Sequence, residues 1–346
     1  MKFLLFFGLL LVSRLSVAQQ PVPIATGRQP SLTTDGDGTV HLVFGRPGEI
    51  WYSASQQETT FSAPVRVDTL SGLHLGASRG PQIAVSKQTV LITAIDGRGN
   101  VWAYCLDRPT GRWTRRIRVT DSPAAAPEGF VALTAAGEPN RFMAVWLDVR
   151  GDKQNKIAGA VTSDGGQTWS ANRLLYRSPD GSVCECCQPS VAASGTQVAI
   201  LFRNWLNGCR DMYVLKSTNG GQTFGDTVRL GQGSWPLKAC PMDGGSLALL
   251  EDGTVETVWR RDNRLFAARP GELEVELGRG KNAQLLSQTG LNLYVWQDEG
   301  NIWALRGVGT EPKRLGPGNF AKLTPFGENQ ALCVWESEGK IVATVL

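Results

Sequence analysis

A short polar turn occurs twice in this chain, and it constrains the fold more than any other feature of the sequence. The copies are Thr162–Trp169 (TSDGGQTW) and Ser217–Phe224 (STNGGQTF). In each copy an Asp or Asn side chain can accept hydrogen bonds from backbone amides ahead of it, and paired glycines permit positive φ angles. The terminal aromatic ring can then fold back against the turn. Because each copy lies between two strand-like apolar runs, the pattern predicts repeated β-hairpins.

The same hairpin, without the polar turn, recurs along the chain. Seven copies are found, at His41–Ser53, Val90–Cys105, Phe142–Val161, Val198–Leu215, Val255–Ala268, Leu291–Leu305 and Ala331–Val345. Short strands at even spacing, with an aromatic residue recurring at one place, are typical of a β-propeller. We therefore predict an all-β propeller of four-stranded blades, seven in number, with six as the alternative count.

An outer fourth strand is visible in four of these units, and the last unit lacks one. The four outer strands are expected at Pro64–Val67, Arg116–Val119, Asn172–Leu175 and Thr227–Leu230. The segment Pro21–Ile24 has the pattern of the missing strand, so we expect it to pair with the final blade and close the ring. No low-complexity linker interrupts the pattern, which predicts a single propeller domain over residues 19–346.

The first 18 residues have the pattern of a secretory signal peptide. Lys2 supplies the positive charge, Phe3–Val12 the apolar segment, and Ser16–Ala18 a small-residue cleavage site. The apolar segment is too short to span a bilayer, and no other segment resembles a membrane span. The sequence therefore predicts export, to the periplasm or the extracellular medium.

The charge balance argues against a nucleic-acid partner. Removal of the signal peptide takes away Lys2 and Arg14, which lowers the 35 basic residues to 33 against 31 acidic ones. A net charge near +2 is far from the strongly basic surface of a nucleic-acid-binding domain. Any charge-based recognition must therefore come from a local arrangement of residues.

The two polar turns resemble the Asp box of sialidases and other BNR-repeat propellers. The residues that carry the resemblance are Ser163, Asp164, Gly166, Thr168, Trp169, Asn219, Gly221, Thr223 and Phe224. The resemblance extends over nearly the whole chain after the signal peptide. It implies that these turns are structural and lie at the periphery of one face. It also implies that ligands bind at the opposite mouth of the central channel.

The loops expected at that mouth are rich in arginine and aspartate. The candidate ligand-binding residues are Arg28, Arg79, Arg150, Arg203, Arg210 and Asp211. Arginine forks bind carboxylates through two parallel hydrogen bonds, so the mouth suits a carbohydrate or another small anionic ligand. The alternative is that these arginines pair with adjacent carboxylates, as Arg210 and Asp211 can.

Two classes of function follow from the resemblance. A glycoside hydrolase of the exo-sialidase type would use Arg28, Arg79 and Arg203 as a carboxylate clamp, with Asp148 as acid/base and Glu128 as a second carboxylate candidate. The other class is a non-catalytic propeller that binds a glycan or a protein partner. The segment Gly27–Pro30 stands where sialidases have an Arg-Ile-Pro signature, which favours the second class.

Five of the seven cysteines are expected on the mouth side of two adjacent blades. They are Cys184, Cys186, Cys187, Cys209 and Cys240, whereas Cys105 and Cys333 fall within predicted strands and are expected to be buried thiols. Export favours disulfides, whose pairing the sequence does not determine. A site for Cu(I) or zinc is the second interpretation, and redox or thiol catalysis is the third. No other cofactor is expected.

Overall fold

The computed structural model describes residues 20–346, with the exception of residues 56, 58, 289 and 290. The predicted signal peptide therefore lies outside the described residues. Within the described part of the chain, no helix is long and apolar enough to cross a membrane.

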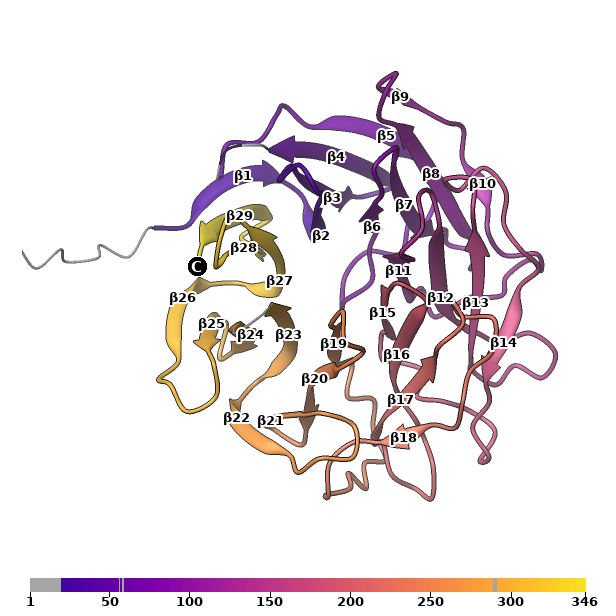
Figure 1. Ribbon diagram of the computed structural model, residues 1–346, viewed down its shortest axis with the longest axis vertical. Coiled ribbons are helices and arrows are strands. Elements are labelled where there is room, and N and C mark those ends of the chain that lie inside the picture. Colours follow the sequence, from indigo (N-terminus) through magenta and orange to yellow (C-terminus); the bar gives the residue numbers. More distant parts are fainter. Residues whose placement is uncertain (1–19, 56, 58, 289–290) are drawn as a thin grey trace, which may run out of the picture.

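Seven antiparallel sheets surround a central axis, and each sheet is one blade (Figure 1). Blade 1 contains β2 (Arg28–Thr34), β3 (Val40–Arg46), β4 (Glu49–Ser55) and β5 (Val65–Thr69), and blade 2 contains β6 (Gln82–Val85), β7 (Thr89–Ile95), β8 (Val101–Asp107), β9 (Arg112–Trp113) and β10 (Ile117–Arg118). Blade 3 contains β11 (Val131–Ala135), β12 (Phe142–Asp148), β13 (Lys156–Thr162) and β14 (Arg173–Tyr176). Blade 4 contains β15 (Ser190–Ser194), β16 (Gln197–Arg203), β17 (Met212–Ser217) and β18 (Val228–Arg229). Blade 5 contains β19 (Ser246–Leu249), β20 (Val255–Arg261), β21 (Arg264–Ala268) and β22 (Val275–Arg279). Blade 6 contains β23 (Lys281–Gln288), β24 (Leu291–Asp298), β25 (Asn301–Arg306) and β26 (Lys313–Pro317). Blade 7 contains β27 (Asn319–Phe326), β28 (Gln330–Ser337), β29 (Lys340–Val345) and β1 (Val22–Thr26).

The count of seven blades is confirmed, and the alternative count of six is wrong. Each predicted hairpin is the second and third strand of one blade. Ring closure by the N-terminal strand is also confirmed, because β1 pairs with β29 through registers such as Val22 with Ala343. The sequence did not reveal the outer strands β22 and β26 of blades 5 and 6.

The hydrophobic core is divided among the seven interfaces between adjacent blades. Seven apolar clusters each combine residues of two neighbouring blades, and the cluster between blades 2 and 3 contains Leu91 and the fully buried Trp146. Both faces of a blade are therefore covered, which explains why every residue of β7 and β12 is buried. The cysteines predicted to be buried in strands, Cys105 and Cys333, lie in two of these clusters.

The two polar turns join the third and fourth strands of blades 3 and 4. Asp164 accepts from the Thr168 backbone amide at 3.0 Å, and Asn219 accepts from the Thr223 amide at 2.9 Å. The paired glycines have positive φ angles, and the aromatic residues Trp169 and Phe224 pack against inter-blade clusters. The first turn also donates a hydrogen bond to Asn140 in the turn between β11 and β12. Both turns thus lie on the face opposite the loops that carry the candidate arginines.

Candidate functional site

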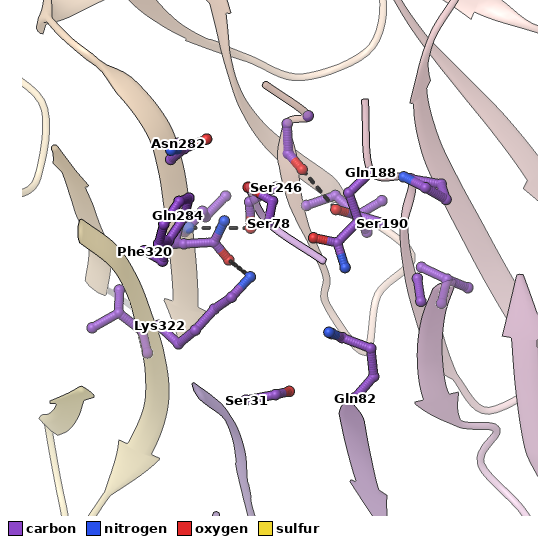
Figure 2. Close-up of a pocket in the computed structure, with 18 of the residues that line it drawn as sticks. Ser31, Ser78, Gln82, Gln188, Ser190, Ser246, Asn282, Gln284, Phe320 and Lys322 are labelled. Carbon is purple, nitrogen blue, oxygen red and sulfur yellow. Dashed lines mark hydrogen bonds between the residues drawn. The ribbon is translucent and has the colours of Figure 1, made fainter. Parts of the chain in front are cut away.

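The innermost strands of the seven blades enclose a polar channel along the axis of the propeller. Its volume is about 230 Å³, and all seven blades contribute to its wall. One ring of the wall takes a single residue from each blade: Ser31, Gln82, Ala132, Ser190, Ser246, Gln284 and Lys322. Six of these side chains are drawn in Figure 2, where they surround a common space. The described wall carries hydroxyl, amide and apolar side chains together with one cationic group.

That cationic group is Lys322 of β27. Figure 2 shows its side chain directed at Gln284, whose Oε1 accepts a hydrogen bond from Nζ at 3.3 Å. No carboxylate of the described residues forms an ion pair with this ammonium group. Burial in the channel lowers the pKa of Lys322 to about 8. The channel therefore holds an isolated positive charge that is still mostly protonated at pH 7.

A repeated local geometry positions three of the ring residues. In blades 1, 6 and 7 a glycine is followed two residues later by a residue with positive φ, and the ring residue comes two residues after that. The positive-φ residues are Gln29, Asn282 and Phe320, and each lies in a β-bulge of the inner strand. The glycine is required because the backbone passes close to a neighbouring side chain, as a Cβ on Gly318 would lie 2.3 Å from the ring of Trp335. These segments, GRQPSL, GKNAQL and GNFAKL, are the sequence signal that could have located the ring.

Two amide side chains of the channel wall donate to backbone carbonyls. Gln82 Nε2 donates to the Pro81 carbonyl at 3.1 Å, and Gln188 Nε2 donates to the Val131 carbonyl at 3.1 Å. Among the described residues neither side-chain oxygen accepts a hydrogen bond, so both oxygens are available as acceptors. A molecule with hydroxyl donors and one anionic group would satisfy both kinds of wall group.

The arginines predicted as a carboxylate clamp all bond to groups of the protein itself. Arg203 is buried, and its guanidinium donates to the carbonyls of Asp243, Arg210 and Arg260 at 3.2, 2.8 and 2.9 Å. Arg79 Nε donates to the Glu128 carbonyl at 2.6 Å, and Arg28 forms an ion pair with Glu336 at 3.0 Å. None of these three arginines lines the axial channel. A role for them in ligand binding stays a prediction.

The other predicted site residues are distributed around the same face. Asp148 is fully buried and accepts from Trp146 Nε1 at 2.8 Å and from Arg150, which also pairs with Asp121 at 2.9 Å. Asp211 accepts from the Trp235 amide at 2.8 Å and pairs with Arg229 at 3.2 Å. Glu128 is partly buried, and burial raises the pKa of its carboxyl group. These contacts give Asp148 and Asp211 structural roles that the sequence did not reveal.

Asp243 is a buried carboxylate that the sequence analysis missed. It precedes Gly244 on the channel wall, and burial raises its pKa. Its Oδ2 accepts from the Asn282 amide at 3.2 Å, whereas its Oδ1 has no hydrogen-bond partner. The available signal was its position in the segment CPMDGGS, between Cys240 and the inner strand of blade 5.

Blade 2 carries a groove in which arginines are exposed. The groove has a volume of about 700 Å³, and Arg98, Arg116 and Arg118 line it together with Trp102. The Arg116 guanidinium lies 5.1 Å from the centre of the Trp102 ring, and Trp102 donates to Asp96 at 2.9 Å. This groove is a second cationic surface, separate from the axial channel.

Three of the five mouth cysteines form one buried group. The Sγ atoms of Cys184, Cys186 and Cys187 all lie within 4.8 Å of one another. Cys184 is 3.2 Å from Cys187 and 3.7 Å from Cys186, and it accepts a hydrogen bond from Arg210 at 2.9 Å. Hydrogen bonds with Cys186 and Cys187, together with nearby guanidinium charge, hold the pKa of Cys184 well below its ordinary value.

The remaining two mouth cysteines lie differently. Cys240 is exposed, and its thiol donates to Glu185 Oε1 at 3.6 Å. Cys209 lies in the turn between β16 and β17, paired through its backbone with Leu206, and is not a member of the three-sulfur group. All seven cysteines are present as free thiols in the structure.

Comparison with known proteins supports the architecture alone. No family model matches the chain, and no curated protein matches it. The SapL1 lectin in complex with alpha methyl fucoside has a similar structure, with a TM-score of 0.55, 10% identity, and coverage of 86% of this chain and 97% of the lectin. A catalytically inactive virginiamycin B lyase from Staphylococcus aureus with Quinupristin has a TM-score of 0.55 at 11% identity, covering 94% and 98% of the two chains.

A sialidase is also among the similar structures. NanB from Streptococcus pneumoniae matches with a TM-score of 0.47 and 13% identity, over 97% of this chain and 71% of the sialidase. That similarity carries no argument about activity, so membership of the sialidase family stays a prediction. The fold and the channel together define a seven-bladed β-propeller with a polar axial cavity.

Proposed function

We propose that this protein is an exported binding propeller whose axial channel takes a small carbohydrate that carries one carboxylate group. The ligand's carboxylate pairs with Lys322, and its hydroxyl groups donate to the side-chain oxygens of Gln82 and Gln188. Export follows from the signal-peptide pattern of residues 1–18. The proposed activity is binding.

The observation that carries the proposal is the isolated ammonium group of Lys322. Burying a charge without a partner is unfavourable, and a depressed pKa is the usual sign of that cost. An anion that enters the channel would supply the missing counter-charge in surroundings where charge–charge attraction is stronger than in water. The positive charge therefore selects for a ligand with a negative group.

The size and polarity of the channel narrow the ligand further. Its volume of about 230 Å³ is below the ~300–1,000 Å³ of pockets that hold drug-sized ligands. A monosaccharide-sized molecule is the appropriate scale. The SapL1 lectin, whose structure contains alpha methyl fucoside, is an example of a propeller of similar architecture with a bound sugar.

The wall chemistry favours binding over hydrolysis. Most glycoside hydrolases use two carboxylates that flank the scissile bond. The described channel wall contributes amides, hydroxyls and one ammonium group. For this reason the proposal assigns recognition, and not bond cleavage, to the channel.

Calorimetry with matched sugars tests the proposal. We expect the protein after signal-peptide removal to bind glucuronate or another sugar acid of similar size, and to bind the neutral parent sugar at least tenfold more weakly. The Lys322→Gln variant should lose the preference for the acid. Lys313→Gln, which removes an exposed lysine of β26, is the matched control and should behave like the wild type.

Two further measurements locate the ligand. Binding should weaken as the pH rises above about 8, because Lys322 then loses its proton; the bound carboxylate itself shifts this loss to a higher pH. The double variant Arg98→Ala/Arg118→Ala should bind as the wild type does. Loss of binding in that double variant, with unchanged binding by Lys322→Gln, would place the ligand in the blade 2 groove and refute the channel assignment.

A further inference from the structure

We infer that Cys184, Cys186 and Cys187 form a binding site for one Cu(I) ion. This site is separate from the axial channel and does not depend on the function proposed for it. The three sulfurs come from a single Cys-Glu-Cys-Cys segment on the mouth side of blade 4.

The sulfur atoms already have the spacing that a three-coordinate ion needs. Three ligands at a metal–sulfur distance of about 2.3 Å, arranged in a plane, lie about 4 Å apart. The distances from Cys184 are 3.2 and 3.7 Å, and the third distance is below 4.8 Å. Only small side-chain rotations would therefore bring the three sulfurs onto one ion.

The backbone holds the segment in place at both ends. The Cys184 amide donates to the Arg203 carbonyl at 3.0 Å, and Val183 pairs with Asn204 at the end of β16. On the other side, Gln188 leads directly into the inner strand β15. The three side chains are at most 3% exposed. The site is thus preorganised, and protein excludes water from it.

The charges around the sulfurs suit an anionic metal–thiolate group. Three thiolates and one Cu(I) ion have a net charge of −2. Arg210 reaches Cys184 Sγ at 2.9 Å, and buried Arg203 acts on the same sulfur electrostatically. The guanidinium charge of Arg210 therefore pairs with the anionic group, and ion binding releases the thiol protons to solvent. Two neutral disulfides would leave the contact between Arg210 and Cys184 without a negatively charged sulfur.

The number of buried sulfurs favours Cu(I) over zinc. Structural zinc sites in proteins are almost always four-coordinate, whereas soft thiolate sets of lower number suit Cu(I). The fourth nearby sulfur, Cys240, is exposed and donates to Glu185 Oε1 at 3.6 Å. Cys209 lies outside the group. The buried ligand set is therefore three sulfurs.

Anaerobic titration of the reduced protein with Cu(I), against a coloured Cu(I) chelator, tests the inference. We expect one ion bound per chain and a first shell of three sulfurs in X-ray absorption spectra. Cys186→Ser should weaken the affinity at least tenfold. Cys240→Ser is the matched control and should bind Cu(I) as the wild type does.

The wild-type spectrum keeps the inference testable if a cysteine variant fails to fold. Weaker binding than the chelator by the wild type would overturn it. A preference for zinc with four sulfur ligands, lost in Cys240→Ser, would also overturn it. So would Cys184–Cys187 and Cys186–Cys240 disulfides in peptide maps of the exported protein prepared without reductant. The sugar-binding assay is unaffected by any of these outcomes, so the two proposals fail separately.

Discussion

Replacing Lys322 with methionine should make the protein more stable at neutral pH. The pKa of Lys322 is about 8 in the folded protein, against 10.5 for an unperturbed lysine. The difference of about 2.5 pKa units corresponds to about 3 kcal/mol of unfavourable free energy in the protonated folded state. This is an upper value, because water in the channel can solvate part of the side chain. We expect a gain of about 1–3 kcal/mol for Lys322→Met at pH 7.

The stability difference between Lys322→Met and the wild type should depend on pH. Because the folded-state pKa lies below the unfolded value, the unfolded chain binds the proton more tightly. The destabilisation is fully present below about pH 8 and disappears as the pH rises towards 10.5. The advantage of Lys322→Met over the wild type should shrink over that interval.

Urea denaturation of both proteins at pH 7 and at pH 10 measures the effect. Lys313→Met, at an exposed position on β26, should change the unfolding free energy by less than about 0.5 kcal/mol. Equal or lower stability of Lys322→Met at pH 7 would show that the ammonium group is compensated within the protein. The argument for an anionic ligand would then lose its basis.

Two further substitutions test the assignment of structural roles. Asp164→Ala removes the acceptor of the Thr168 amide hydrogen bond of 3.0 Å. The substitution should lower the unfolding free energy in urea denaturation by about 1–2 kcal/mol without changing ligand binding. An unchanged unfolding free energy would argue against a structural role for the turn. Arg203→Met leaves three carbonyl acceptors without their donor and should lower stability by at least about 3 kcal/mol in the same urea-denaturation assay. Arg28→Ala, at a half-exposed ion pair, should cost under about 1 kcal/mol.

The propeller could be predicted because the second and third strands of its repeating blades are recognisable from their sequences alone. The second strands of the blades are largely buried, as every residue of β12 is, and most of their apolar runs end in an aromatic residue such as Trp146 or Trp335. The outer strands β22 and β26 carry no such signal, since most of their residues face solvent. Their existence follows from backbone pairing with β21 and β25.

The site was less predictable because loop position does not reveal hydrogen-bond partners. Arg203 was selected as a mouth residue, yet its guanidinium is occupied by three carbonyls, two of which belong to segments at least 40 residues away in sequence. Lys322 was overlooked because a lysine in a strand is ordinarily at the surface. Only closure of the ring turns that strand position into the wall of a channel. The cysteine run was visible in the sequence, but the contact of Arg210 with Cys184 was not.

The pairing of β1 with β29 also dictates the order of events during synthesis. β1 leaves the ribosome before every other strand of the ring, and its partner leaves after all of them. Nearly the whole chain must therefore be made before the seventh blade can form. Contacts at such long sequence separation slow folding, and the unpaired edges of an open ring favour association with other chains in the meantime. The last step of assembly joins the first and the last strand of the ring.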